Sequence, residues 1–151
     1  MVSWTGTEAH VATLVQDFLR EQMEATTLCR DAERALEATT AHDLVADLAD
    51  VHERELGELR ELAERFGVEL PERGTHREAR SLGRLRRARR RDGDDEVLAV
   101  VHDVEDRLGA AYDRALTNTT LPDAYRPLFE AASQTLRRHR ERLGAVERAA
   151  R

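Results

Sequence analysis

The sequence predicts an all-α fold, a four-helix bundle formed by one domain, and three observations lead to this prediction. Ala, Leu, Glu and Arg are the commonest residues among the 151, and these residue types favour helices. Three prolines and eight glycines leave few points at which a helix must end. Apolar residues recur at helical spacing in four long segments, and no stretch alternates apolar with polar residues as a half-buried strand does. The length suits a single domain over residues 1–151 with a buried core.

The first two helices are predicted over about residues 8–37 and 41–66. Thr5 and Glu8 have the spacing of a capping box, in which a hydroxyl and a carboxylate bond to the first turn of a helix. Gly67 follows the second segment and suits the left-handed conformation that ends helices. The short connection between the two segments predicts an antiparallel hairpin. The apolar residues that follow helical periodicity are Val11, Leu14, Val15, Phe18, Ala25, Leu28, Ala32, Leu36, then Leu44, Val45, Leu48, Leu56, Leu59, Leu62 and Phe66.

Two further helices are predicted over about residues 94–117 and 123–149. Acidic residues beginning at Asp92 open the third helix, where negative charge is favourable at the positive end of the helix dipole. Asp123 is the predicted cap of the fourth helix, because Pro127 is tolerated only near a first turn. A short connection again predicts an antiparallel hairpin. The apolar positions are Val97, Leu98, Val101, Val104, Leu108, Tyr112, Leu116, then Leu128, Phe129, Ala132, Leu136, Leu143 and Val146.

Residues 67–93 connect the two hairpins and are long enough to run back along the bundle, since a helix of about 26 residues is about 39 Å long. One long crossover between two hairpins is the ferritin-like topology, in which the second and third long helices are parallel. Residues 75–91 predict a short helix within this crossover that lies across the bundle. Residues 76–91 hold eight Arg and one Glu, a charge of +7 in a chain of net charge −6, so that the other residues carry −13. We expect Leu82 and Leu85 to pack on the bundle and the arginines to pair with acidic helix faces.

Each apolar stripe is interrupted near its middle by side chains that can bind a metal ion. His52 and Glu55 stand at i, i+3 spacing in the second helix, which directs both side chains to one place. Counting residues from the turns places Glu21 opposite Glu55 and His52 level with Glu105, whereas His139 lies about one helical turn away. The predicted metal site therefore consists of Glu21, His52, Glu55, Glu105 and His139.

The residues allow three interpretations of this polar layer. Each of these groups would cost roughly several kcal/mol to bury without a partner, and iron, manganese or zinc would offset this cost through carboxylate and imidazole bonds. A metal-free network would instead pair Glu21 with His52 and Glu105 with His139. In the third interpretation, some of these side chains lie at the edge of the seam and reach water. A bound metal and no cofactor at all are equally compatible with the sequence.

Short motifs in all four long helices resemble one superfamily. They are Leu19-Arg-Glu-Gln-Met-Glu-Ala, Asp50-Val-His-Glu-Arg-Glu-Leu-Gly-Glu-Leu-Arg, Arg65-Phe-Gly-Val-Glu-Leu-Pro, Val104-Glu-Asp-Arg-Leu-Gly-Ala-Ala-Tyr-Asp-Arg-Ala-Leu and Arg138-His-Arg. With these motifs the chain resembles the ferritin-like superfamily, in particular a bacterial family of ferritin-like four-helix domains of unknown function. The resemblance covers about residues 11–147 and implies a four-helix bundle with one long crossover.

The resemblance also implies which residues would bind metal. The di-iron members of the superfamily carry one Glu on each of two helices and Glu-x-x-His on each of the other two. Glu21 matches the lone Glu of the first helix, with Glu24 as an alternative one turn away, and Glu105 matches that of the third helix. His52 and Glu55 occupy the paired positions of the second helix with the residue types exchanged.

The fourth helix departs from the di-iron pattern. It reads Leu136-x-x-His139, so the bridging carboxylate of the pair is absent. This absence weakens the case for a non-haem iron oxidase or ferroxidase, and a single metal ion or none becomes the better expectation. The superfamily also implies a homo-oligomer, which we expect to be a dimer formed through outer helix faces.

Several other features limit the function classes. Cys29 is the only cysteine and cannot form an internal disulfide; beside Leu28 on a buried face, it is interpreted as a packing residue. The N-terminal residues lack a basic patch and an apolar run, so we expect no signal peptide, no membrane span and a cytoplasmic location. The arginine run 82–91 has no interleaved aromatic residues and is followed by acidic residues, which disfavours nucleic-acid binding.

Two functional hypotheses follow from the sequence. In the first, the bundle binds iron, manganese or zinc at the five predicted residues. In the second, a metal-free helical bundle acts as an oligomerising or partner-binding structural protein, and its polar layer sets the register of the helices.

Overall fold

The computed structural model describes residues 6–71, 76–91, 93–118 and 121–149, without the side chains of residues 6–9, 76–79 and 91. Within these ranges every regular element is an α-helix, which confirms the all-α prediction. None of the described helices is both long and apolar enough to cross a membrane. All the predicted helix ends lie within three residues of those observed for α1 (Gly6–Ala35), α2 (Thr39–Arg65), α3 (His76–Arg91), α4 (Asp94–Thr117) and α5 (Arg126–Ala149).

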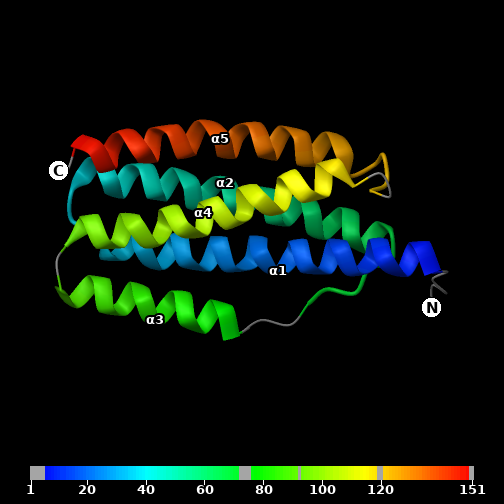
Figure 1. Ribbon diagram of the computed structural model, residues 1–151, viewed down its shortest axis with the longest axis horizontal. Coiled ribbons are helices and arrows are strands. Elements are labelled where there is room, and N and C mark those ends of the chain that lie inside the picture. The colour runs from blue at the N-terminus through cyan, green and yellow to red at the C-terminus, as the bar shows by residue number, and fades with distance from the viewer. Residues whose placement is uncertain (1–5, 72–75, 92, 119–120, 150–151) are drawn as a thin grey trace.

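The four long helices lie side by side along the long axis of the molecule (Figure 1). Helices α1 and α2 run antiparallel, as do α4 and α5, whereas α2 and α4 run in the same direction (Figure 1). Each long helix packs against two others, because α1 and α5 both contact α2 and α4. The shorter helix α3 packs against α1 and α4 outside this group of four. The chain thus leaves α2 at one end of the molecule and begins α4 at the other.

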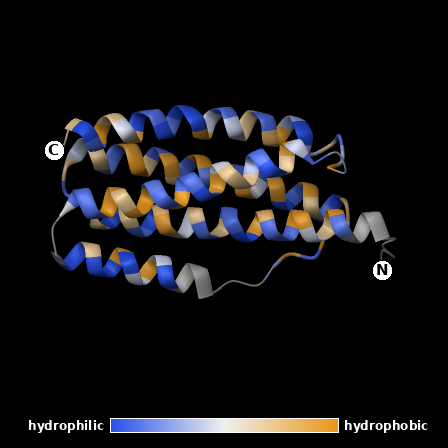
Figure 2. Ribbon diagram, in the orientation of Figure 1, coloured by the Kyte–Doolittle hydropathy of each residue, from blue (hydrophilic) through white to orange (hydrophobic). Residues whose placement is uncertain are grey.

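The core lies between the long helices, and its residues follow a repeat of alternating three- and four-residue steps. In α1 this repeat runs from Val11 through Phe18 to Leu36, and it keeps one face inward over the whole helix. Figure 2 shows apolar and hydrophilic residues on different sides of the helices. Phe18 stacks on Phe129 with a centroid distance of 4.4 Å and meets Tyr112 edge-on at 4.5 Å. These aromatic contacts join α1, α4 and α5 in one core.

Glycine ends α2 as predicted. Gly67 has φ of 70°, a conformation that suits glycine because a Cβ would meet the neighbouring carbonyl oxygen. The amide of Val68 donates to the carbonyl of Ala63 at 2.8 Å, and the amide of Gly67 donates to that of Glu64 at 3.0 Å. These bonds satisfy carbonyls that the end of the helix leaves open. At the other end of the chain, the predicted capping box starts at Thr5, which lies outside the described residues.

Helices α4 and α5 begin in two different ways. The Asp94 carboxylate accepts hydrogen bonds from the amides of Glu37 and Ala38 at 3.0 and 2.7 Å, so the first residue of α4 also holds the α1–α2 turn. Helix α5 begins at Arg126, with Pro127 in its first turn as expected. The predicted cap, Asp123, lies instead in the preceding turn, where its carbonyl accepts from the Arg126 amide at 3.3 Å.

The leucines of α3 pack as predicted, but the helix lies along the bundle rather than across it (Figure 1), and most of its arginines do not pair as predicted. Leu85 is buried and Leu82 packs against the core. Arg84 forms an ion pair of 2.8 Å with Asp103 of α4. In contrast, no ion pair or hydrogen bond within the described part of the chain involves four other exposed arginines of this helix, Arg86, Arg87, Arg89 and Arg90. The expected neutralisation of the run by acidic helix faces is therefore wrong for these four residues.

Candidate metal centre

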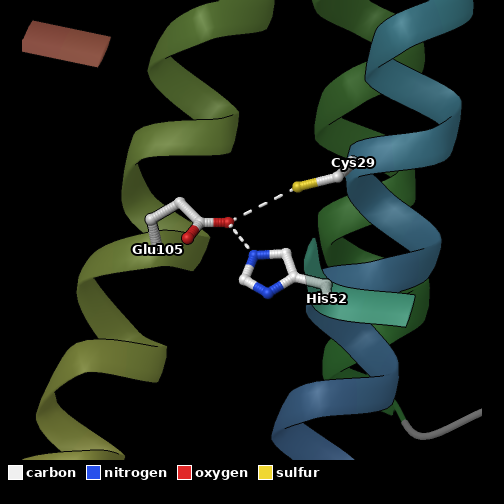
Figure 3. A group of neighbouring side chains, drawn as sticks. All are labelled: Cys29, His52 and Glu105. Carbon is white, nitrogen blue, oxygen red and sulfur yellow. Dashed lines mark hydrogen bonds and ion pairs between the residues drawn. The ribbon is translucent and has the colours of Figure 1, made fainter. Parts of the chain in front are cut away.

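Three side chains from three helices meet inside the core. Cys29 of α1, His52 of α2 and Glu105 of α4 each offer one possible ligand atom, and these atoms all lie within 4.8 Å of one another. Figure 3 shows the Glu105 carboxylate directed at both partners, with the imidazole ring below the thiol. The Nε2 atom of His52 lies 2.7 Å from Oε1 of Glu105, and Sγ of Cys29 donates to the same oxygen at 3.4 Å. All three side chains are buried.

Helical periodicity brings these residues to the core. Each of them continues the three-and-four repeat of its own helix, so its side chain points in the same direction as the apolar residues one turn before and after. The buried apolar residues three or four positions before and after each of them are Ala25 and Ala32 around Cys29, Leu48 and Leu56 around His52, and Val101 and Leu108 around Glu105. The polar layer is therefore enclosed by apolar layers on both sides.

The hydrogen bonds of Glu105 are incomplete. Its Oε1 accepts from both His52 and Cys29, whereas its Oε2 is buried and has no hydrogen-bond partner in the described part of the chain. A buried carboxylate oxygen without a donor costs roughly 1–3 kcal/mol or more. This oxygen is consequently the atom of the cluster that most needs a further partner.

The other edge of the imidazole faces a second set of polar groups. Nδ1 of His52 lies 3.2 Å from the amide nitrogen of Gln22 and 3.8 Å from Oε2 of Glu55. The hydroxyl of Tyr112 donates to the Gln22 amide oxygen at 3.2 Å and lies 3.4 Å from Glu55. Glu55 is the outermost member, with 11% of its side chain exposed. The network thus extends from the buried Glu105 through His52 towards the surface at Glu55.

Burial and charge change the acid–base properties of the cluster. Burial by itself lowers the pKa of His52, but the Glu105 charge and the hydrogen bonds around the ring outweigh it, so that the pKa lies well above its usual 6.5. Burial, assisted by the charge of Glu105, raises the pKa of the Cys29 thiol to about 11. Burial also raises the pKa of Tyr112. Without a metal ion, His52 and Glu105 form an imidazolium–carboxylate pair beside a protonated thiol.

The charged state of His52 has a consequence for Gln22. An imidazolium carries hydrogen on both nitrogens, so its Nδ1 needs an acceptor rather than the amide nitrogen of Gln22. Turning this amide over would place its oxygen against Nδ1 and its nitrogen towards the Tyr112 hydroxyl. The present orientation instead lets the amide nitrogen donate to the His52 carbonyl at 3.4 Å and to Oε2 of Glu55 at 3.5 Å.

The structure brings together only part of the site predicted from the sequence. His52 and Glu105 are in contact, as their predicted common level requires, and Glu55 lies at the edge of the network. Glu21 is not a member of the cluster; its neighbour Gln22 faces the imidazole instead. His139 also lies outside the cluster, and its Nδ1 bonds to the carbonyl of Thr135 in its own helix at 2.9 Å. The five predicted residues therefore do not converge on one point.

Two residues of the observed site, Cys29 and Gln22, are not among those predicted from the sequence. Cys29 was expected only to pack in the core. Both residues belong to the repeat Val11, Val15, Phe18, Gln22, Ala25, Cys29, Ala32 and Leu36, all of which are buried. The stripe expected from the sequence combined most of this repeat with Leu14 and Leu28 of a neighbouring face, and it therefore placed Glu21 rather than Gln22 in the core. The alternation of three- and four-residue steps along α1 is the sequence signal that indicates both Gln22 and Cys29.

The alternative ligand on α1, Glu24, belongs to a different contact. It is only 4% exposed, and its Oε1 accepts from the Ser81 hydroxyl of α3 at 2.9 Å and from Arg107 of α4 at 3.0 Å. Arg107 also donates to the Ser81 hydroxyl oxygen at 3.0 Å. Glu24 is therefore a buried anchor between three helices, and it is not a member of the Cys29–His52–Glu105 cluster.

Comparisons with known proteins add no family to this description. No protein-family model, no curated protein and no solved structure matches the chain.

Proposed function

We propose that this protein is a ferritin-like helical bundle that binds one divalent transition-metal ion through Cys29, His52 and Glu105. The observation that carries the proposal is the convergence of a thiol, an imidazole and a carboxylate within 4.8 Å in a buried layer. A second observation supports it, because the unpartnered Oε2 of Glu105 belongs to the same layer. A cation bound by both carboxylate oxygens of Glu105 would give Oε2 the partner that it lacks.

The donor atoms favour zinc or iron(II). Zinc is bound by Cys, His and carboxylate side chains, with bonds of about 2.0–2.3 Å. Ligand atoms around such an ion lie about 3–4 Å apart, and the two separations at Oε1 of Glu105, 2.7 and 3.4 Å, are close to this range. A thiolate favours zinc or iron over manganese, which prefers oxygen ligands. Of the three metals expected from the sequence, manganese therefore fits this donor set least well.

The same geometry supports one ion rather than two. A di-iron centre needs carboxylates from all four helices, but the cluster has one carboxylate, and Glu21 and His139 lie outside it. Three protein ligands leave one position of a tetrahedral ion for water or substrate. An ion there would act as a Lewis acid, or as a redox centre if it were iron. With an ion on Nε2, Nδ1 of His52 would carry the proton, and Glu55, whose Oε2 lies 3.8 Å away, would be the acceptor on that side, the usual task of residues behind a metal ligand.

The ferritin-like topology is supported by the arrangement of the helices. Two antiparallel pairs are joined by one long connection, and α2 and α4 run in the same direction (Figure 1). The di-iron members of that superfamily also place their metal ligands on the inner faces of the long helices. The chain keeps this location but offers a different set of ligands.

Metal analysis tests the proposed function. Protein purified without chelators should contain about one zinc or iron per chain, and cobalt(II) added to the metal-free protein should produce a sulfur-to-cobalt charge-transfer band. Cys29→Ser should abolish this band, and Glu105→Gln should weaken cobalt binding about tenfold or more. Glu21→Gln and His139→Gln are matched controls and should bind cobalt like the wild type. A band that survives Cys29→Ser, or a purified protein that takes up no zinc, iron or cobalt, would contradict the proposal.

A second candidate function rests on the His52–Glu105 contact itself. The 2.7 Å separation between Nε2 of His52 and Oε1 of Glu105 is that of a direct ion pair, which needs no metal to hold α2 and α4 in register. In this case the protein acts as a metal-free structural bundle that oligomerises or binds a partner. A melting temperature that does not respond to added zinc, iron or cobalt would favour this alternative. The dimer expected from the resemblance remains a prediction, to be checked by light scattering.

A further inference from the structure

A cavity of about 210 Å³ lies between the last turns of α1 and helix α3. Arg34 and Asp31 line it from α1, and Arg86 and Arg89 line it from α3. The cavity shares no residue with the proposed metal site.

The wall formed by α3 is held firmly against the long helices. The Ser81 hydroxyl and the Arg107 guanidinium both donate to the buried carboxylate of Glu24. Further along α3, Leu85 and Ala88 are 4% and 7% exposed and belong to the main core. Because these contacts fix α3 on the bundle, the cavity is part of the folded structure and does not depend on a ligand to form it.

The charge of the cavity is positive and only partly neutralised. Three guanidinium groups face one carboxylate, and that carboxylate, Asp31, is paired with Arg34 at 3.2 Å. Arg86 and Arg89 have no ion pair or hydrogen bond in the described part of the chain. On the opposite flank of α3, Arg84 is paired with Asp103. Two of the arginines of α3 that lack a partner in the described part of the chain, Arg86 and Arg89, therefore line the cavity, and Arg87 and Arg90 are exposed outside its lining.

The floor of the cavity is apolar. Ala35 of α1 and Leu82 and Leu85 of α3 complete its lining, between the charged residues of the two helices. An inorganic anion would contact the arginines but would leave this floor without a partner. An uncharged apolar molecule would leave Arg86 and Arg89 without an ion-pair partner. A ligand that satisfies both parts has an anionic head and an apolar body.

We propose that this cavity binds an amphiphilic organic anion, with a carboxylate or phosphate head at Arg86 and Arg89 and an apolar chain over Leu82 and Leu85. Guanidinium groups match both head groups because each presents paired N–H donors to two oxygens. The chain would cover apolar surface of the floor, a contribution that grows with each methylene buried. This site is independent of the proposed metal site.

Three probes separate the parts of the ligand. Octanoate carries both the head and the chain, octyl phosphate changes only the head, and octanol and acetate each lack one part. Isothermal titration should show saturable binding of octanoate and octyl phosphate, with octanol and acetate about tenfold weaker or more. The stronger of the two anions identifies the head group. Equal binding of octanol, or no saturable binding of either anion at millimolar concentration, would overturn the proposal.

Two double variants on the same helix test the location. Arg86→Gln with Arg89→Gln removes the unpaired charges that line the cavity, and octanoate affinity should fall about tenfold or more. Arg87→Gln with Arg90→Gln removes the same charge from exposed positions outside the lining and should change affinity by about twofold or less. All four side chains are exposed, so both variants should fold normally, which circular dichroism verifies. An equal loss in the two variants would show that only the net charge of α3 attracts the anion, and the cavity site would be rejected.

Discussion

His52 and Glu105 are 53 residues apart in the chain, yet Nε2 of the first lies 2.7 Å from Oε1 of the second, with both side chains buried. The two residues belong to α2 and α4, which run in the same direction but are not among the helix pairs that pack closely. Their side chains therefore meet across the core. Because buried charges are costly without a partner, this contact makes the two residues mutually dependent.

The first prediction concerns this dependence in metal-free protein. Glu105→Leu leaves the His52 imidazolium without its counter-charge and should reduce the free energy of unfolding by about 3–5 kcal/mol. His52→Leu combined with Glu105→Leu removes both charges and should be more stable than either single variant. Urea unfolding with a chelator present measures all three.

A control variant shows what a carboxylate on the surface contributes. Glu130→Gln alters an exposed residue of α5 and should change stability by no more than about 0.5 kcal/mol. If Glu105→Leu were as mild as this control, or if the double variant lost the sum of the two single losses, the two buried charges would not be coupled.

The second prediction concerns pH. The pKa of His52 lies above its usual 6.5 in the folded protein, so the folded state holds this proton more tightly than the unfolded state. The stabilisation is therefore fully present below pH 6.5 and is lost as the pH rises through the folded-state value. The Cys29 thiol acts in the same direction, with stability lost as the pH rises from 9.0 to about 11.

Unfolding of the metal-free protein from pH 5 to 10 checks this prediction. The stability of the wild type relative to the double leucine variant of His52 and Glu105 should be greatest at the acidic end and decline above the usual histidine range. NMR titration of the His52 ring should give an elevated pKa. A stability difference that instead increased with pH would show that the ring is neutral in the fold.

The third prediction rests on the proposed metal site. At pH 7 the raised pKa values place a proton on both Cys29 and His52, and a metal ion must displace these protons to bind there. If two protons are released, the apparent Kd for zinc falls roughly a hundredfold for each unit by which the pH rises. Titration of zinc in buffers of different ionisation enthalpy measures the protons released. Release of fewer than about one proton would exclude the thiolate as a ligand.

The fourth prediction concerns the buried anchor of α3. Glu24→Gln weakens the contacts to Arg107 and Ser81 and should cost about 1–3 kcal/mol, because a charged partner is lost inside the protein. Hydrogen exchange should accelerate most in the amides of α3. Arg84→Gln breaks an exposed pair on the same helix and should cost less than about 1 kcal/mol. Equal protection of α3 in both variants would contradict an anchoring role for Glu24.

The fifth prediction uses one substitution at two glycines, one within α2 and one just after its end. Gly57 lies within the helix with nothing within 4 Å of an added Cβ, so Gly57→Ala should stabilise the protein by roughly 0.5–1 kcal/mol. Gly67 has φ of 70°, and Gly67→Ala should destabilise it by about 1–2 kcal/mol. Thermal and urea unfolding compare the variants. Changes of the same sign at both positions would contradict the opposite backbone conformations.

The helices were predictable because their signals are local. Helix-favouring residues, periodic apolar stripes and the glycine at position 67 depend only on neighbours in the chain, and the observed helix ends lie within three residues of those expected. The common level of His52 and Glu105 was also predictable from helix lengths. The start of α5 was less accurate, because Asp123 could cap a helix but is used in the turn before it.

The ligand set was less predictable, because it depends on the rotation of each helix about its axis. Neighbouring residues point about 100° apart around a helix. A prediction that selects the adjacent face of α1 therefore names Glu21 where the structure has Gln22. His139 continues the repeat of α5 but bonds to its own helix through Thr135. The pairing of the α3 arginines likewise depends on which acidic residues come within reach. Among the exposed arginines of α3 whose side chains are described, only Arg84 has an acidic partner in the described part of the chain, Asp103 of α4.

The sequence by itself determined where the helices form, how long they are and that polar residues occur in their apolar stripes, since these properties follow from residue types and local spacing. Only the tertiary structure decided that Cys29 joins His52 and Glu105, that Glu24 anchors α3 and that Arg86 and Arg89 face a cavity. Each of these contacts joins residues of different helices. Their geometry is set by how the helices rotate and pack against one another, and many weak apolar contacts together determine that packing.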